Sequence, residues 1–276
     1  MREFSTGRRL LGFLGIALSI AMVATGCAKD DQGGASEKHP DVKLISSGKL
    51  LVCTGLPYKP FEFKKGGEVV GFDVDLMDLV ADELGVKQDI VDTPFEGIKS
   101  GQDLNTGRCD AAAAGMTITP EREKVMDFSK GYFSAQQSML VKAGKPYKSL
   151  ADLKGEKVGV QTGTTGEAYT REQNEKQKLG LEIVSFEDLA AEQQALASGS
   201  IQAAINDDTV WTDVAKQDPD KYELAASFDT GEEYGVAVKK GNKALLKVID
   251  DVIAKAKQDG TYDKIYKEWF GKAPGA

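Results

Sequence analysis

From Lys49 onward, short apolar runs alternate with amphipathic segments, and this alternation constrains the fold more than any other feature of the sequence. The pattern is typical of β-α-β units around a mostly parallel sheet. Two successive series of such units can be distinguished. In the first we predict strands at 50–54, 88–91 and 110–114, and helices at 73–84 and near 97–106. In the second we predict strands at 157–160, 182–185 and 203–206, and helices at 149–153, 166–178 and 186–198, with Ser149 as a cap.

The two series are joined by two stretches, 132–136 and 228–233, that lack apolar continuity. Beyond the second stretch we predict a strand at 234–238, a helix at 243–259 and an aromatic tail. Two crossings indicate an α/β body of two lobes with a hinge. We predict lobe 1 at 43–131 plus 234–276 and lobe 2 at 137–227, with the ligand in the cleft between them, beyond the carboxyl ends of strands.

The amino terminus has the pattern of an export signal. Arg8 and Arg9 precede an apolar run, Leu10–Ala24, which is shorter than the roughly 20 residues of a membrane-spanning helix. Small residues then precede Cys27, as in the lipobox of bacterial lipoproteins. We predict a signal peptide at 1–26, a lipidated Cys27 and a flexible tether at 27–42; a short membrane anchor is the alternative, and the paired arginines leave twin-arginine export open.

Composition excludes several classes of function. The formal net charge of −8 disfavours a nucleic-acid partner. The only histidine, His39, lies in the predicted tether, and Cys53 and Cys109 are the only cysteines besides Cys27. The chain therefore has too few histidine and cysteine side chains for a zinc site or for histidine-based catalysis, and we expect no metal and no cofactor.

Three segments at predicted strand ends are candidate binding elements. The segment 114–122 ends in Thr-Pro-Glu-Arg, so either Arg122 and a helix start bind an anion, or Thr119 is simply a helix cap beside a surface arginine. The turn 161–166 resembles a phosphate loop but has no lysine, which suits a smaller anion or an ordinary loop. The third segment is 206–209, Asn-Asp-Asp-Thr. Here we expect Asp207 to face the cleft and bind an ammonium group, and Asp208 to cap a helix.

Aromatic residues add a possible apolar wall for a ligand. Tyr58 lies between two prolines in a loop after the first strand, which favours a binding role for it over Phe61 or Phe63. Phe95 precedes a predicted helix, where core packing is the alternative.

Several motifs together resemble family 3 extracellular solute-binding proteins, the polar amino-acid receptors of ABC importers. The likeness runs from about Gly48 to Gly271. It rests on KLLVCT at 49–54, PFEF at 60–63, VGFDVDL at 70–76, AGMTITPER at 114–122, DFS at 127–129, GYF at 131–133 and GTYDKIY at 260–266.

The resemblance implies a periplasmic-binding-protein type II fold and a set of ligand contacts. Arg122, helped by Thr117 and backbone N–H groups near Thr164 or Thr165, would bind the α-carboxylate; Asp207 would bind the α-ammonium with Gly115 and Thr117. Tyr58 and Phe95 would flank the side chain. The predicted ligand-binding residues are Tyr58, Phe95, Ala114, Gly115, Thr117, Arg122, Gln161, Thr164, Thr165 and Asp207.

The sequence departs from the family pattern at Gly55, where many members have an aspartate that contacts the ligand side chain. Its loss removes a partner for a cationic or amide group. At Gln161 some members have lysine or another residue that helps to select the ligand side chain, and a glutamine there suits a neutral polar group. In an oxidising compartment, a disulfide between Cys53 and Cys109 is favoured over two buried thiols if strand register brings them together.

The leading hypothesis is a monomeric, lipid-anchored extracytoplasmic protein that captures a polar amino acid and delivers it to an ABC permease in the membrane. A dehydratase or lyase on the same fold is the enzymatic alternative, and Glu62, Asp207 and Glu233 are its only candidate acids or bases. A ligand-sensing module is the third.

Overall fold

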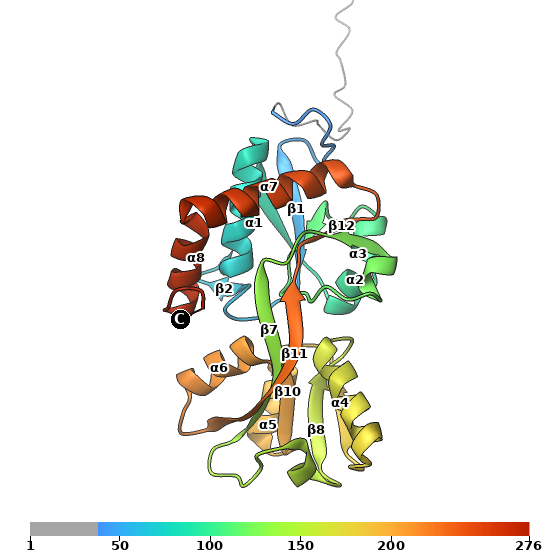
Figure 1. The fold of residues 1–276 in the computed structure, drawn as a ribbon, viewed down its shortest axis with the longest axis vertical. Helices are drawn as coiled ribbons and strands as arrows, with labels where there is room; N and C mark the ends of the chain where they lie inside the picture. Colours follow the sequence, from blue (N-terminus) through green and yellow to red (C-terminus); the bar gives the residue numbers. More distant parts are fainter. Residues whose placement is uncertain (1–37, 276) are drawn as a thin grey trace, which may run out of the picture. The chain divides into compact units, whose positions relative to one another are not determined.

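Residues 38–275 are described in the computed structural model (Figure 1). The predicted signal peptide, Cys27 and most of the predicted tether lie outside this range. No helix within 38–275 is long and apolar enough to cross a membrane.

The first lobe is built on a five-stranded sheet. Its strand order is β4 (Lys87–Asp92), β1 (Lys49–Thr54), β5 (Ala111–Ala112), β12 (Ala237–Lys239), β6 (Met126–Phe128). β1 pairs in parallel with β4 and β5, whereas β12 is antiparallel to β5 and β6. The remaining elements of this lobe are the hairpin β2 (Phe63–Lys65) and β3 (Glu68–Val70), helices α1 (Phe72–Leu84), α2 (Phe95–Lys99), α3 (Gln102–Asn105), α7 (Lys243–Asp259) and α8 (Thr261–Phe270), and the 3₁₀ turn Arg122–Lys124.

The second lobe has its own five-stranded sheet. The order is β11 (Tyr222–Tyr234), β7 (Phe133–Lys142), β10 (Ala203–Asp207), β8 (Lys157–Gln161), β9 (Glu182–Phe186). β10, β8 and β9 are parallel, and β7 is antiparallel to both of its neighbours. The helices of this lobe are α4 (Thr165–Gln177), α5 (Leu189–Ser198) and α6 (Asp208–Gln217), with a 3₁₀ turn at Leu150–Leu153.

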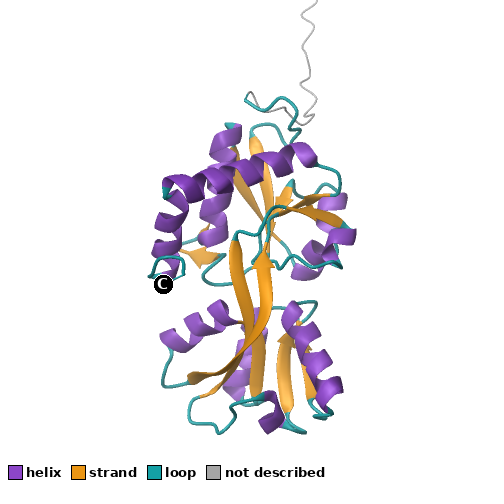
Figure 2. Cartoon of the chain, viewed as in Figure 1, coloured by secondary structure: helices purple, strands orange, loops and turns teal. Residues whose placement is uncertain are grey.

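Two long antiparallel strands make the crossings between the lobes. β7 and β11 pair from Tyr234 opposite Phe133 to Tyr222 opposite Lys142, with irregular register between Phe228 and Glu232. They run from one lobe into the other, as Figure 2 shows. The carboxyl-terminal segment therefore returns to the first lobe, where β12, α7 and α8 complete the sheet and its cover. This is a two-lobed α/β fold with two hinge crossings.

Aromatic side chains from four separate segments of the chain pack where β7 and β11 enter the first lobe. The rings of Phe61, Phe72, Phe133, Tyr234 and Phe270 lie 5.0–6.2 Å apart, centroid to centroid, and most pairs meet edge to face. Such pairs stabilise a core beyond the burial of their area. The aromatic tail predicted after the last long helix is α8, and it supplies one side of this cluster.

Most predicted elements are present, and the differences have local causes. The single helix predicted near 97–106 is split into α2 and α3, because Gly101 adopts a left-handed conformation with φ of 72°. The predicted strand 110–114 is reduced to two residues in β5. Phe186 ends β9 instead of beginning α5, whose N-cap is Asp188.

Other predicted starts and caps also differ in detail. Ser149 precedes the 3₁₀ turn, but its hydroxyl donates to the Asp152 carboxylate instead of capping the backbone. The strand predicted at 234–238 is divided: Tyr234 ends β11, and β12 begins at Ala237. The long β11 was not predicted, because its exposed, charged residues hide the strand pattern.

Cys53 and Cys109 form a disulfide, with Cα atoms 5.7 Å apart. Cys53 pairs with Ala112 across the parallel ladder of β1 and β5, and Cys109 lies just before β5. Both cysteines are buried. The bond closes a loop of the first lobe across 56 positions of sequence.

Candidate functional site

The chain segments after four strands meet in one small cavity between the lobes. Gly55 and Tyr58 follow β1, residues 114–117 follow β5, residues 161–165 end β8 and begin α4, and Asp207 ends β10. Carboxyl ends of strands are where ligands bind in open α/β sheets. The cavity is lined by Gly55, Tyr58, Glu62, Phe95, Ala114, Gly115, Thr117, Arg122, Gln161, Thr164, Thr165 and Asp207.

All ten residues predicted to bind a ligand line this cavity, although they span about 150 positions of sequence between Tyr58 and Asp207. The other two are Gly55, which the sequence marked as a departure from the family pattern, and Glu62. The accessible volume is about 20 Å³, room for roughly one water molecule. An organic ligand therefore requires the lobes to part and close again.

Arg122 is a buried cation at this cavity. Its guanidinium donates to the carbonyl oxygen of Thr117 at 2.7 Å and to that of Gly163, in the second lobe, at 3.3 Å. It also lies over the ring of Phe95, 5.3 Å from the centroid. Burial lowers the pKa of Arg122, while the nearby charges of Asp207 and Glu232 oppose that shift. The side chain is oriented by backbone and ring contacts, with further N–H donors left for an anion.

Asp207 is the matching buried anion on the second lobe. Its carboxylate accepts hydrogen bonds from the Tyr58 hydroxyl at 2.7 Å, from the Gln137 amide at 2.5 Å and from the Tyr234 hydroxyl. Burial raises the pKa of Asp207 to about 6, and the charge of Glu232 adds to the rise. The Tyr58 hydroxyl also donates to Asn206 at 2.9 Å, so the first lobe is hydrogen-bonded directly to the second.

Glu232, on the second crossing, joins the two lobes through a network that sequence analysis did not find. Its carboxylate accepts from the hydroxyls of Thr117 in the first lobe at 2.6 Å and Thr165 in the second at 2.7 Å. The Gln137 amide, from the first crossing, donates to it at 2.9 Å. Nothing in local sequence marks these residues, since they lie in crossing strands whose pairing only the fold defines.

The segment 115–118 is held by the second crossing. Thr117 forms a β-bridge with Tyr234, and the N–H of Ile118 donates to the carbonyl of Glu233 at 2.8 Å. Gly115 has φ of 51°, and a Cβ there would lie 2.7 Å from the Tyr58 ring. Only glycine lets the chain pass this close to the tyrosine. Tyr58 therefore packs against the segment that carries Thr117.

The helix start expected after Thr119 is only a three-residue 3₁₀ turn, Arg122–Lys124. The Thr119 hydroxyl accepts the Arg122 N–H at 3.2 Å, as a cap would. A turn this short has no appreciable macrodipole, so the expected dipole contribution is wrong and Arg122 itself is the cationic element. Asp208 likewise is not a cap: it is the first helical residue of α6, and Asp207 occupies the N-cap position.

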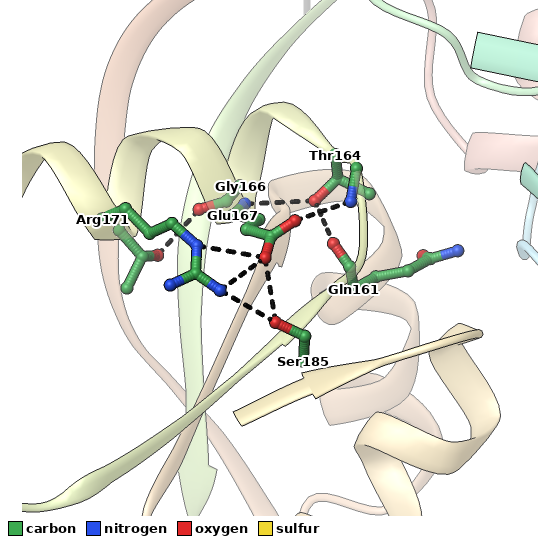
Figure 3. Close-up of polar contacts among 8 residues, drawn as sticks. Gln161, Thr164, Gly166, Glu167, Arg171 and Ser185 are labelled. Atoms are coloured by element: carbon green, nitrogen blue, oxygen red, sulfur yellow. Dashed lines mark hydrogen bonds and ion pairs between the residues drawn. The ribbon is translucent and has the colours of Figure 1, made fainter. Parts of the chain in front are cut away.

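The turn before α4 is braced by the network in Figure 3. Thr164 is the N-cap, and its hydroxyl oxygen accepts the Glu167 N–H at 3.1 Å. The Glu167 carboxylate accepts the Gly163 N–H at 2.7 Å and bonds Arg171 and Ser185. Burial alone would raise the pKa of Glu167, but these donors lower it below its usual value. The turn that carries Thr164 and Thr165 is thus fixed before any ligand arrives.

The aromatic residues divide between site and core. Tyr58 and Phe95 line the cavity, whereas Phe61 is fully buried in the aromatic cluster and Phe63 packs on Trp269. His39 lies outside the cavity, where its ring nitrogen is 3.2 Å from the Glu83 carboxylate. Within 38–275, no cluster of histidine, cysteine or carboxylate side chains has the arrangement of a metal site.

A family model of the bacterial extracellular solute-binding proteins, family 3, matches residues 50–272, which is nearly the whole described body. The chain belongs to this family. Its members are extracytoplasmic, and the family's type II fold agrees with the two lobes and two crossings described above.

Individual relatives and solved structures agree with this family assignment. The ABC transporter glutamine-binding protein GlnH of Bacillus subtilis is 34% identical over 270 residues, covering 94% of this chain and 96% of that protein. An ancestral arginine-binding protein bound to arginine is 42% identical with a TM-score of 0.76, covering 81% of this chain and 99% of the other. The ancestral amino-acid-binding protein AncCDT-1, a precursor of cyclohexadienyl dehydratase, is 39% identical with a TM-score of 0.72, covering 81% and 95%.

Proposed function

We propose that this protein binds a free amino acid between its lobes, outside the cytoplasm, and delivers it to the permease of an ABC importer. The observation that carries the proposal is the pairing of one buried cation, Arg122, with one buried anion, Asp207, at the same closed cavity. Two opposite charges on opposite lobes suit a zwitterion. The names of similar proteins, which include glutamine-binding and arginine-binding receptors, support this ligand class.

In this proposal Arg122 binds the α-carboxylate through two parallel N–H donors, and backbone N–H groups at Thr164 and Thr165 assist. Asp207 binds the α-ammonium, together with the Gly115 carbonyl and the Thr117 hydroxyl. Tyr58 and Phe95 pack on the side chain, while Ala114 and Gln161 complete the wall. When the ammonium arrives, it takes over the place of the tyrosine hydroxyls on Asp207.

Closure of the lobes is the signal that the permease reads. Arg122 lies in the first lobe and Asp207 in the second, so a ligand touches both only in the closed form. The ligand therefore shifts the open–closed equilibrium by the difference in its affinity for the two forms. The irregular register of β11 between Phe228 and Glu232 is a natural place for the crossing strands to bend.

We further propose that the protein acts without catalysis. Asp207 and Glu232 already accept several hydrogen bonds each, an arrangement that fixes a ligand instead of moving its protons. The similarity to a precursor of a dehydratase makes an enzyme the alternative to test. A lyase would convert the bound amino acid, whereas a receptor returns it unchanged after unfolding, which mass spectrometry distinguishes.

The placement of the protein in the cell is also part of the proposal. Residues 1–26 act as a signal peptide, Cys27 carries the lipid that anchors the protein to the membrane, and 27–42 form the tether of a monomer. The lobes span 43–131 plus 234–276 and 137–227. Metabolic labelling with a fatty-acid analogue tests this: the wild-type chain takes the label, and Cys27→Ala does not.

A thermal-shift panel of L-amino acids tests ligand binding, using protein refolded to remove carried-over ligand. A ligand at ~100 times its Kd adds about 2.7 kcal/mol of stability, or roughly 5–10 °C in midpoint for a body of this size. Arg122→Lys should abolish the shift, because lysine lacks the planar two-donor fork. Arg108→Lys, an exposed substitution outside the cavity, should keep it. No shift with any amino acid would contradict the proposal.

A further inference from the structure

Four side chains with hydroxyl groups line the ligand cavity, and each donates its hydrogen to another group of the protein. The donors and their acceptors are Tyr58 to Asn206 and Asp207, Thr164 to the Gln161 carbonyl, and Thr117 and Thr165 to the Glu232 carboxylate. A hydroxyl group has one hydrogen to donate and two lone pairs that accept. These four side chains therefore present oxygen lone pairs to a ligand, and their hydrogens are already in use.

Glu232 is the acceptor that fixes the direction of the Thr117 hydroxyl. Its carboxylate is 8% exposed and accepts four hydrogen bonds of 2.6–2.9 Å, from the hydroxyls of Thr117, Thr165 and Thr230 and from the Gln137 amide. An ionised carboxylate has no hydrogen to give, and four donors match its four lone-pair sites. The hydrogen of Thr117 therefore points to Glu232, and a lone pair of the same oxygen is left for the cavity.

Backbone pairing brings Thr117 and Glu232 together. Thr117 forms a β-bridge with Tyr234, and the N–H of Ile118 donates to the carbonyl of Glu233, so the neighbours of Glu232 on β11 hold the segment that carries Thr117. This contact does not involve the part of the cavity that would take a ligand side chain. Its effect should therefore be the same for every amino acid that the site accepts.

The proposed position of the ligand ammonium is then surrounded by acceptors: the Asp207 carboxylate, the Gly115 carbonyl and the lone pair of Thr117. An α-ammonium group has three hydrogens and no lone pair, so it matches three acceptors. An α-hydroxyl group has a single hydrogen. If it donates to Asp207, its oxygen faces the other two oxygens without a hydrogen between them, and buried polar groups left unpaired cost affinity.

We propose that Glu232 makes the site selective for an α-ammonium group over an α-hydroxyl group, by holding Thr117 as a hydrogen-bond acceptor. This rests on the proposed function and narrows its ligand class: the site takes amino acids and rejects the 2-hydroxy acids with the same side chains. Glu232 does not line the cavity, so it is a positioning residue that acts through Thr117.

Titration calorimetry with two probes tests the proposal. The probes are the L-amino acid that gives the largest shift in the thermal panel and the 2-hydroxy acid of the same side chain and configuration. The wild-type protein should bind the amino acid at least roughly 100-fold more tightly, because the hydroxy acid loses the ion pair with Asp207 and leaves oxygens unpaired.

Glu232→Gln removes the charge and keeps the shape. Its amide NH₂ can donate to Thr117, whose hydroxyl hydrogen then turns toward the cavity. The ratio of the two affinities should fall roughly tenfold or more, the scale of one hydrogen bond to a charged group. Glu172→Gln is the charge-matched control, because Glu172 is an exposed residue that lines an outer groove together with Glu232 and pairs with Lys176. It should keep the wild-type ratio.

Thr117→Val tests the direction of the hydroxyl without changing Glu232. It should weaken the amino acid roughly tenfold, since the ammonium loses an acceptor, and leave the hydroxy acid unchanged or more tightly bound. A Thr117 hydroxyl that donated into the cavity would instead make this variant lose affinity for the hydroxy acid, which would overturn the proposal even if Glu232→Gln did not fold.

The double variant separates hydroxyl direction from the loss of charge. In the Thr117→Val background, Glu232→Gln should change the affinity ratio at least about fivefold less than it does beside the threonine. An equal change in both backgrounds would mean that the charge acts by itself, and the proposal would be wrong.

Failure of the proposed function looks different. If none of the common L-amino acids binds, the proposed function fails. If an amino acid binds and its hydroxy acid binds equally well, the function stands and the selection by Glu232 is wrong. An unchanged ratio in folded Glu232→Gln protein would overturn the selection in the same way.

Discussion

At the scale of single residues, the same chemical group has different roles according to its partners. Burial raises the pKa of several carboxyl groups, among them those of Glu62, Asp73, Glu192 and Asp207. The pKa values of Asp73 and Asp207 rise to about 6 and that of Glu192 to about 8. Asp73 and Asp207 offset part of this cost through several hydrogen-bond donors, whereas for Glu62 only the Thr54 hydroxyl opposes the rise.

Asp207 makes folding stability depend on pH in a defined direction. Its folded pKa of about 6 lies above its ordinary value of 3.8, so between these values the folded chain holds more protons than the unfolded chain. Stability from this group is therefore lost as pH rises through that window. Relative to Asp207→Asn, the wild-type protein should lose up to about 3 kcal/mol between pH 4 and 7. Urea denaturation at several pH values measures this, and a pH-independent difference would contradict it.

At the scale of elements, periodicity predicted the long regular segments and missed the short ones. α1, α4 and α7 lie within one residue of their predicted bounds, because apolar periodicity or a clear cap marks them. α2 and α3 were predicted as one helix, since Gly101 breaks the helix without breaking the apolar spacing. The turn before α4 owes its geometry to Glu167, three residues after the cap, a pattern that sequence does show.

Glu167→Ala should loosen that turn. The Gly163 N–H loses its acceptor, and Arg171 and Ser185 lose a shared partner, so we expect a loss of about 1–3 kcal/mol in the free energy of unfolding. Ligand affinity should fall as well, because Thr164 and Thr165 are held less firmly. Glu172→Ala on the same helix is the control: its exposed pair with Lys176 should contribute less than about 1 kcal/mol. Equal effects of the two substitutions would refute the bracing role.

At the scale of the whole molecule, the return of the chain decides what the site contains. β11 carries Glu232 and Tyr234 back between the lobes, and α8 brings Phe270 onto the aromatic cluster. The proposed ligand-binding residues, the hinge residues and the residues that stabilise them therefore come from segments throughout the chain. No segment of this chain contains the cavity by itself.

Phe270→Ala should destabilise the first lobe although it lies far from the cavity lining in sequence. Its ring packs within 5.1 Å of both Phe72 and Phe133, centroid to centroid. Because it is only partly buried, we expect a loss near the lower end of the usual range of about 3–5 kcal/mol for such truncations. Ile45→Ala, at a side chain that is 40% exposed, should change stability by less than about 0.5 kcal/mol. Chemical denaturation of both variants measures the contrast.

The sequence by itself determined the class of fold and ten of the twelve residues that line the cavity, since strand ends, caps and family motifs are local features of the chain. It also marked Gly55 as unusual. The tertiary structure alone decided that Gln137, Glu232 and Tyr234 join the lobes, that Glu62 is buried, and that Asp207 instead of Asp208 occupies the N-cap position of α6. The physical reason is that the burial and the hydrogen bonds of a side chain depend on which distant segments come into contact. The pairing of β7 with β11 determines those contacts.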